Sequence, residues 1–250
     1  MLFNLTVYVQ MTRNNFYNRE ELTEVKCGQT GTGLLIEHDG HIITENDTVR
    51  QIREDIGAKR QFVIPDRFIV SAVFQKYGIK NANGRIYPEN TLKREVERYL
   101  SERVANHNAV GSLDHPSSST LSGHDVSHNI IDLRWEGRTL VGEMELHLSP
   151  GFRKYGVCST SGDLVACMIL DGILIGVSSR AIGSVEKKFD ALYVADDLDL
   201  VCWDVVLEPS TPNAWIATDA NDLRPYVENK ERFAANLSEK INKINSILMG

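Results

Sequence analysis

ILDGILIGVSSR, residues 169–180, carries an apolar run into two adjacent hydroxyl side chains, Ser178 and Ser179. A short apolar run bounded by glycine predicts a buried strand, and Gly176 lets the backbone bend closely before the first serine. A serine presented at a strand end becomes a nucleophile when a nearby base removes its proton. The alternative without chemistry is a strand end with a capping hydroxyl.

A second tight motif, GSLDHP at residues 111–116, places His115 in a turn bounded by glycine and proline. Pro116 confines the backbone of His115 to extended angles and so directs the ring. An imidazole with an ordinary pKa of about 6.5 is a suitable general base at neutral pH. Together the two motifs predict a serine peptidase in which His115 activates Ser178. A histidine packed in a turn is the alternative.

A third residue should orient the imidazole, and Asp204 in VCWDVV at residues 201–206 is the candidate. A carboxylate in an apolar strand is costly to bury without a partner, although an outward-facing position on an edge strand explains it equally well. Arg180 and Ser179 are candidates for contact with the oxyanion or the substrate. For Arg180 the alternative is a surface salt bridge, and Ser179 points away from Ser178 if the strand continues.

Composition excludes several classes of protein. The chain has 250 residues, 42% of them hydrophobic and 24% charged, as expected for one sizeable domain with an appendage. A net charge of −7 gives no general attraction to nucleic acid, and no apolar stretch is long enough for a membrane span. The four cysteines form no CxxC pair, and His124 and His128 lack a third ligand. We therefore expect no metal, no cofactor, no nucleic acid and no membrane.

Turn and periodicity signals divide the chain into three parts. Residues 1–60 read as an N-terminal extension with a β-hairpin turning at Asp39-Gly40 and a helix over 47–59. Residues 61–220 form the main domain, and residues 221–250 form an amphipathic helical tail. The absence of βαβ regularity favours a mixed barrel or sandwich. In the main domain, strands are expected at 68–74, 130–135, 139–148, 173–178, 185–189 and 200–206, and helices at 89–106 and 164–170.

Four motifs in this order resemble the prohead core proteases of large tailed phages. They are NGRIYP at 83–88, GSLDHP at 111–116, GVSSR at 176–180, and Trp203-Asp204 followed by PSTPNAW at 209–215. The resemblance spans about residues 67–217. It implies an α+β fold like that of the herpesvirus maturation protease, a mostly antiparallel β-barrel surrounded by helices.

The resemblance also implies the chemistry, a serine endopeptidase with His115 as base and Ser178 as nucleophile. The herpesvirus relatives use a second histidine as third member, but this chain has none after His147, so Asp204 takes that role. The chain also departs from the family pattern at Ala181, where glycine is usual.

By the same resemblance, the protein works inside the phage prohead in the host cytoplasm. It would cut scaffold or core proteins and the major capsid protein after glutamate, and the herpesvirus relatives make a homodimer plausible. Self-cleavage is implied as well, with Leu22-Thr23-Glu24 and Leu237-Ser238-Glu239 matching the expected site and residues 1–60 acting like a propeptide. The rival hypotheses are a non-catalytic scaffold or capsid-interaction protein on the same fold, and a serine hydrolase acting on esters.

Overall fold

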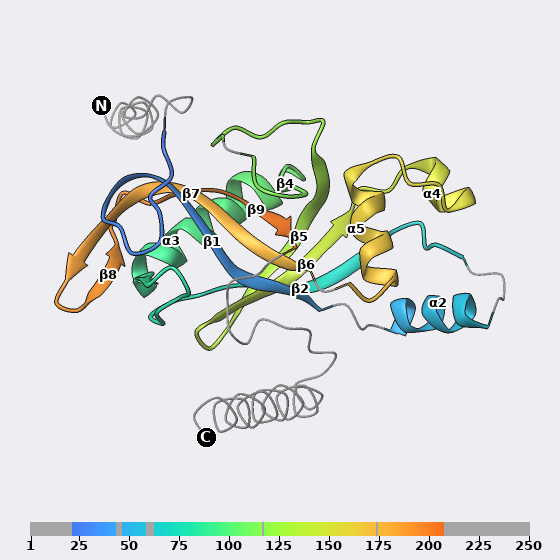
Figure 1. Cartoon of the computed structure of the whole chain (residues 1–250), viewed down its shortest axis with the longest axis horizontal. Helices are drawn as coiled ribbons and strands as arrows, with labels where there is room; N and C mark the ends of the chain where they lie inside the picture. Colours follow the sequence, from blue (N-terminus) through green and yellow to red (C-terminus); the bar gives the residue numbers. More distant parts are fainter. Residues whose placement is uncertain (1–21, 44–46, 59–62, 117, 174, 208–250) are drawn as a thin grey trace, which may run out of the picture.

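The computed structural model describes residues 22–43, 47–58, 63–116, 118–173 and 175–207. Its strands are β1 (Gly31–Ile43), β2 (Ile69–Lys76), β3 (Arg85–Ile86), β4 (Val110–Ser112), β5 (Val126–Glu136), β6 (Thr139–Leu146), β7 (Gly176–Lys188), β8 (Ala191–Val194) and β9 (Asp199–Val206). Its helices are α2 (Asp47–Gly57), α3 (Glu89–Tyr99), α4 (Pro150–Tyr155) and α5 (Ser161–Leu170), with a π-helical turn η1 (Leu100–Val104) after α3. In Figure 1, α2, α4 and α5 gather at one end of the sheet and the β7–β8 hairpin extends at the other.

The strands of the described residues form one strongly curled sheet (Figure 1). Their order is β3-β8-β7-β1-β2-β6-β5-β4, with β9 also pairing with β7, and the parallel β3–β8 pair is the exception to antiparallel pairing between named strands. A bridge between Leu113 and Val205 brings the chain after β4 back to β9. The predicted α+β class with a mostly antiparallel sheet is therefore confirmed, in the form of a half-barrel.

The hairpin predicted at Asp39-Gly40 is wrong. β1 continues through both residues and pairs with β7 on one side and β2 on the other. The register shifts between Glu37, opposite Ser179, and Gly40, opposite Val177, so a β-bulge lies across from Ser178. Backbone pairing on two sides outweighs the local turn preference, and the bulge absorbs the extra bend. Residues 31–43 thus lie in the same sheet as the catalytic candidates.

β7 joins two segments that the sequence predicts as separate strands, 173–178 and 185–189. Pairing with β1 and β9 carries the strand on past Ser178, and Gly183 lets Leu198 pack closely on it, because a Cβ there would lie 3.2 Å from the Cα of Leu198. The expectation that Ser178 ends a strand is therefore also wrong. Ser178 is the third residue of a long buried strand that is flanked by β1 and β9.

The core behind the site is aromatic. Trp203 of β9 is fully buried and meets Phe74 of β2 and Tyr99 of α3 edge to face, at ring-centre distances of 5.5 and 5.1 Å. Because side chains alternate along a strand, the neighbours of Trp203 on β9, Cys202 and Asp204, face the other way. Burial of Trp203 therefore sets which face of β9 presents Asp204.

The local predictions for helices and turns hold in outline. α2 occupies most of the predicted 47–59 helix, and a turn at 136–138 joins β5 to β6 as expected. α3 ends at Tyr99 and passes into η1, so it is shorter than the predicted 89–106 helix. α5 begins at Ser161 because the Thr160 side chain and Asp163 form a capping box.

Several predictions fall on residues outside the described ranges. They concern the tail at 221–250, the PSTPNAW motif at 209–215 and Glu239. In the part of the chain that is described, no helix is both long enough and apolar enough to cross a membrane.

Candidate active site

A block of four side chains on β7 and β9 forms the floor of the site. Ser178 pairs with Asp204 and Arg180 with Cys202 in the antiparallel register. Residues two apart on a strand share a face, so all four side chains lie on the same side of this strand pair. All four are fully buried. The sheet register thus makes a hydroxyl and a carboxylate cross-strand neighbours.

His115 reaches this floor from the chain that follows β4. Leu113 bridges to Val205, and the Asp114 amide donates to the Val205 carbonyl at 2.8 Å. Asp114 has a left-handed φ of 63°, a conformation that aspartate tolerates better than most residues. This reversal, followed by Pro116, turns the His115 ring toward β7 and β9.

The ring of His115 joins the two cross-strand neighbours. Nδ1 lies 2.8 Å from Asp204 Oδ2, and Nε2 is hydrogen-bonded to Ser178 Oγ. With Nδ1–H donating to the carboxylate, Nε2 carries the lone pair that accepts the serine hydroxyl. The His115 side chain is 11% exposed, so solvent and ligands can approach its edge. The contact that the two motifs predict between His115 and Ser178 is present.

Asp204 is stabilised as a carboxylate despite its burial. Burial alone would raise its pKa, but the hydrogen bond from His115, the charge of Arg180 and the Ser112 amide outweigh that effect, so the pKa lies below its ordinary value. The Ser112 amide donates to Oδ1 at 2.9 Å. Asp204 is therefore ionised at neutral pH and can stabilise a positive charge on His115.

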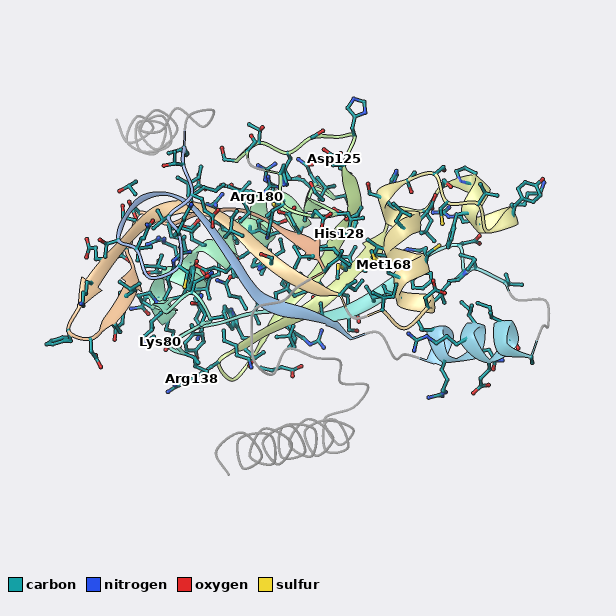
Figure 2. All side chains as sticks on the ribbon, viewed as in Figure 1. Lys80, Asp125, His128, Arg138, Met168 and Arg180 are labelled. Atoms are coloured by element: carbon teal, nitrogen blue, oxygen red, sulfur yellow. The ribbon has the colours of Figure 1, made fainter. Side chains whose placement is uncertain are left out.

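Arg180 of β7 also contacts Asp204, and Figure 2 shows it well apart from Lys80 and Arg138. Its Nε lies 3.0 Å from Oδ2 of Asp204, and its Nη2 donates to Oδ1 at 3.1 Å. Arg180 is fully buried, so the alternative of a surface salt bridge is wrong.

Ser179 points to the opposite face from Ser178, as strand alternation predicts. Its position aligns with Glu37 of β1, and its side chain is 1% exposed. Its hydroxyl makes no hydrogen bond within the described residues. The structure thus leaves Ser179 apart from the contact between Ser178, His115 and Asp204.

His128 is a buried residue near the site that the sequence analysis weighed only as a metal ligand with His124. His124 is exposed in the loop before β5, whereas His128 is fully buried on β5 and hydrogen-bonded through Nδ1 to Ser127 Oγ at 2.9 Å. Burial lowers the pKa of His128 to about 4, against smaller opposing effects from Asp204 and the Trp203 carbonyl. His128 is therefore neutral at pH 7. The sequence signal for its burial is the predicted strand that begins at Ile130, which the structure extends back through His128.

Gly111 explains why the histidine motif begins with glycine. A Cβ at this position would lie 2.0 Å from the Trp203 carbonyl oxygen and 2.5 Å from Cε1 of His128. β4 can therefore approach β9 closely enough for the Ser112 amide to reach Asp204 only when residue 111 has no side chain.

The NGRIYP motif forms a second buried polar cluster, around Glu37. Its carboxylate accepts from Arg85 Nη1 at 2.6 Å, from Tyr87 at 2.9 Å and from Asn81 and Asn83 at 2.6 and 2.7 Å. Four donors offset the cost of burying this carboxylate. The motif therefore anchors the 81–87 loop to β1.

Glu24, predicted as a self-cleavage position, lies in a short segment that pairs with β1. The Val25 amide donates to the Leu34 carbonyl and the Leu34 amide donates to the Thr23 carbonyl, both at 3.0 Å. Arg85 also donates to the Val25 carbonyl. Leu34 pairs with Ile182, four residues along β7 from Ser178, so Glu24 lies away from the candidate site.

Comparisons with known proteins show the family and the fold of this chain. The family model of prohead core protein serine proteases matches residues 27–222, which begins well before the motifs at 67–217. The prohead core protein protease of Enterobacteria phage T4 is 28% identical over 188 residues, 74% of this chain and 76% of that protein. The solved structure of the bacteriophage T4 capsid assembly protease shares the fold, with a TM-score of 0.56 and 22% identity over 71% of this chain and 99% of that one. This chain belongs to the family of prohead core protein serine proteases.

Proposed function

We propose that the protein is a maturation endopeptidase of the phage prohead, with Ser178 as nucleophile, His115 as general base and Asp204 as the residue that orients the imidazole. The observation that supports these roles best is the unbroken path from Ser178 Oγ through His115 to Asp204. Membership of a serine protease family supplies the reaction class.

In the proposed reaction, His115 Nε2 accepts the Ser178 proton while Oγ attacks the scissile carbonyl carbon. The imidazolium that forms is stabilised by ionised Asp204, and it then gives its proton to the leaving amine. Water hydrolyses the acyl-enzyme with His115 again as base. Backbone N–H groups stabilise the oxyanion in this proposal, because the contacts of Arg180 direct its guanidinium to Asp204.

The proposed substrates are the scaffold or core proteins and the major capsid protein, cut after glutamate inside the prohead within the host cytoplasm. The T4 relative is a prohead core protein protease, which supports this setting. We also propose that the half-barrel is related to the herpesvirus protease barrel. The Leu113–Val205 bridge, which brings β4 toward β9, supports such closure.

Self-processing after Glu24 or Glu239 is part of the proposal. The segment around Glu24 is extended, as a protease substrate must be, but its pairing with Leu34 has to be released before it can enter an active site. We therefore expect cleavage after Glu24 to be slow in the folded protein. Intact-mass measurement of active protein checks this, and retention of both ends in fully active protein would contradict self-processing.

The proposed function is tested by co-expressing the chain with the scaffold and capsid proteins of its phage and mapping new termini by mass spectrometry. The wild type should produce termini after glutamate, and Ser178→Ala should produce none while keeping its circular dichroism spectrum and melting temperature. Cleavage by the Ser178→Ala variant would refute the nucleophile. Unchanged masses with the wild type would favour a non-catalytic scaffold or capsid-interaction protein.

A further inference from the structure

We propose that Arg180 is a positioning residue, which acts through Asp204 and the chain after His115 instead of contacting the reacting carbonyl oxygen. The proposal rests on the catalytic roles given above for Ser178, His115 and Asp204. It assigns a task to the arginine of the GVSSR motif that differs from oxyanion binding.

The two Nη atoms of Arg180 make four hydrogen bonds, and its Nε lies beside the Asp204 carboxylate. Nε lies 3.0 Å from Asp204 Oδ2, and Nη2 lies 3.1 Å from both Asp204 Oδ1 and Cys202 Sγ. Nη1 donates to the Ser118 carbonyl at 2.5 Å and the Thr120 carbonyl at 3.3 Å. A guanidinium has five donors in a fixed plane, and the four on Nη1 and Nη2 are engaged here. The Nε–H makes no hydrogen bond within the described residues, but Nε is buried 3.0 Å from Asp204 Oδ2, so the guanidinium is held toward Asp204 and the 118–120 carbonyls.

The two carbonyls that Nη1 contacts belong to the segment that follows His115 and Pro116. The Ser118 hydroxyl contacts the Thr120 hydroxyl at 2.7 Å and accepts from the Thr120 amide at 3.1 Å, which closes a small turn. That turn presents its carbonyls to Arg180. One buried guanidinium therefore holds both the carboxylate that orients the imidazole and the chain that carries it.

The charge of Arg180 also supports its role as a positioning residue for Asp204. The titratable groups facing Asp204 are His115 after β4, Arg180 on β7, Cys202 on β9, and His128 and Tyr99 from the elements packed behind. Burial raises the pKa of the Cys202 thiol and of Tyr99, and lowers that of His128 to about 4, so all three are neutral at pH 7. Within the described residues facing Asp204, Arg180 thus carries the permanent positive charge that offsets the buried carboxylate.

A double-mutant cycle separates positioning from oxyanion binding. The proteins are the wild type, Arg180→Gln, Asp204→Asn and the double variant. The probes are a fluorogenic peptide containing Leu-Thr-Glu-Val and the rate at which diisopropyl fluorophosphate labels Ser178, read by intact mass. The second probe does not depend on glutamate specificity. Residues that act through one another have non-additive effects.

We expect Arg180→Gln alone to lower kcat/KM about 10- to 100-fold, as misplacement of a catalytic group does. Adding the same change to Asp204→Asn should alter both rates by less than about threefold, because the partner of Arg180 is already lost. An oxyanion ligand would instead cost about 10²- to 10³-fold in either background. Equal losses in the two backgrounds overturn the proposal.

The same four proteins also show whether a loss of activity comes from loss of folding. Arg180→Gln leaves a buried carboxylate without its cation and is expected to be the least stable variant, whereas the double variant removes both charges. If Arg180→Gln does not fold, the comparison of Asp204→Asn with the double variant still decides between the two roles. Arg134→Gln and Asp132→Asn remove an exposed pair on β5, 2.9 Å apart, and should show neither activity loss nor coupling.

A spectroscopic readout does not require turnover. The His115 Nδ1–H proton that donates to Asp204 should give a far-downfield proton resonance in the resting wild type. Arg180→Lys, which keeps the charge but not the planar contacts, should shift or broaden this signal. An unchanged signal in Arg180→Lys overturns the proposal. Absence of peptide cleavage and Ser178 labelling in the wild type would refute the proposed function instead, and the resonance would still test the role of Arg180.

Discussion

The buried imidazole of His128 should make the stability of this fold depend on pH. Its pKa is about 4 in the folded protein and about 6.5 in an unfolded chain. Below pH 6.5 the unfolded chain takes up a proton that the folded protein does not bind until about pH 4. The free energy of unfolding therefore falls as the pH falls through this window, and the full stabilisation is present above it.

The magnitude follows from the difference between the two pKa values. At about 1.36 kcal/mol per pH unit, the loss of stability from His128 is about 2 kcal/mol at pH 5 and about 3 kcal/mol at pH 4. For a domain of this size, 2 kcal/mol corresponds to a melting temperature lowered by roughly 4–8 °C.

Urea unfolding of the wild type and His128→Gln at pH 7.5, 6 and 5 measures this effect. The substitution also changes packing, so the quantity compared between the two proteins is the change in the free energy of unfolding with pH. We expect the wild type to lose about 2 kcal/mol more than His128→Gln between pH 7.5 and 5. His124→Gln is the matched control and should keep the wild-type slope, because His124 is exposed. Equal slopes in the wild type and His128→Gln would refute the reasoning.

Three further predictions concern close packing, a buried ion pair and catalysis. Gly111→Ala should lower the free energy of unfolding in urea by about 3 kcal/mol, because the added Cβ would lie 2.0 Å from the Trp203 carbonyl oxygen. Gly123→Ala is the control and should be neutral, because a Cβ there would have nothing within 4 Å. Equal costs for the two variants would contradict the packing argument. Arg85→Met should cost about 3–5 kcal/mol by leaving the Glu37 carboxylate buried without its cation. Adding Glu37→Gln should recover part of that loss, and a further loss would count against the ion pair. Asp204→Asn should lower kcat on a glutamate-containing peptide about 10⁴-fold, and a decrease of less than tenfold would exclude Asp204 as the orienting residue.

Some features of this protein follow from local sequence because neighbouring residues carry the physical cause. The turn at 136–138, the helix after residue 47 and the capped start of α5 depend on turn formers and caps within a few residues. His115 belongs to this class as well, since Pro116 restricts its backbone.

The course of β1 and the length of β7 depend on distant residues, and the sequence predicts both wrongly, whereas the predicted strands at 139–148 and 200–206 lie close to β6 and β9. Asp39-Gly40 favours a turn, yet β7 and β2 hold both sides of β1 and convert the turn into a bulge opposite Ser178. Likewise β7 does not stop at Ser178, because β1 and β9 supply backbone partners beyond it. Hydrogen bonds between strands far apart in sequence outweigh local preference here.

The residue types of the proposed triad, which are a serine, a histidine before proline and a carboxylate in an apolar strand, could be identified from the chain alone. Their mutual contact could not, because it depends on the register that pairs Ser178 with Asp204 and on the bridge that brings His115 over both. The contact between Arg180 and Asp204 likewise depends on the register between β7 and β9. Cross-strand neighbours are set by how two strands align, and a slip of one residue would turn the carboxylate to the opposite face.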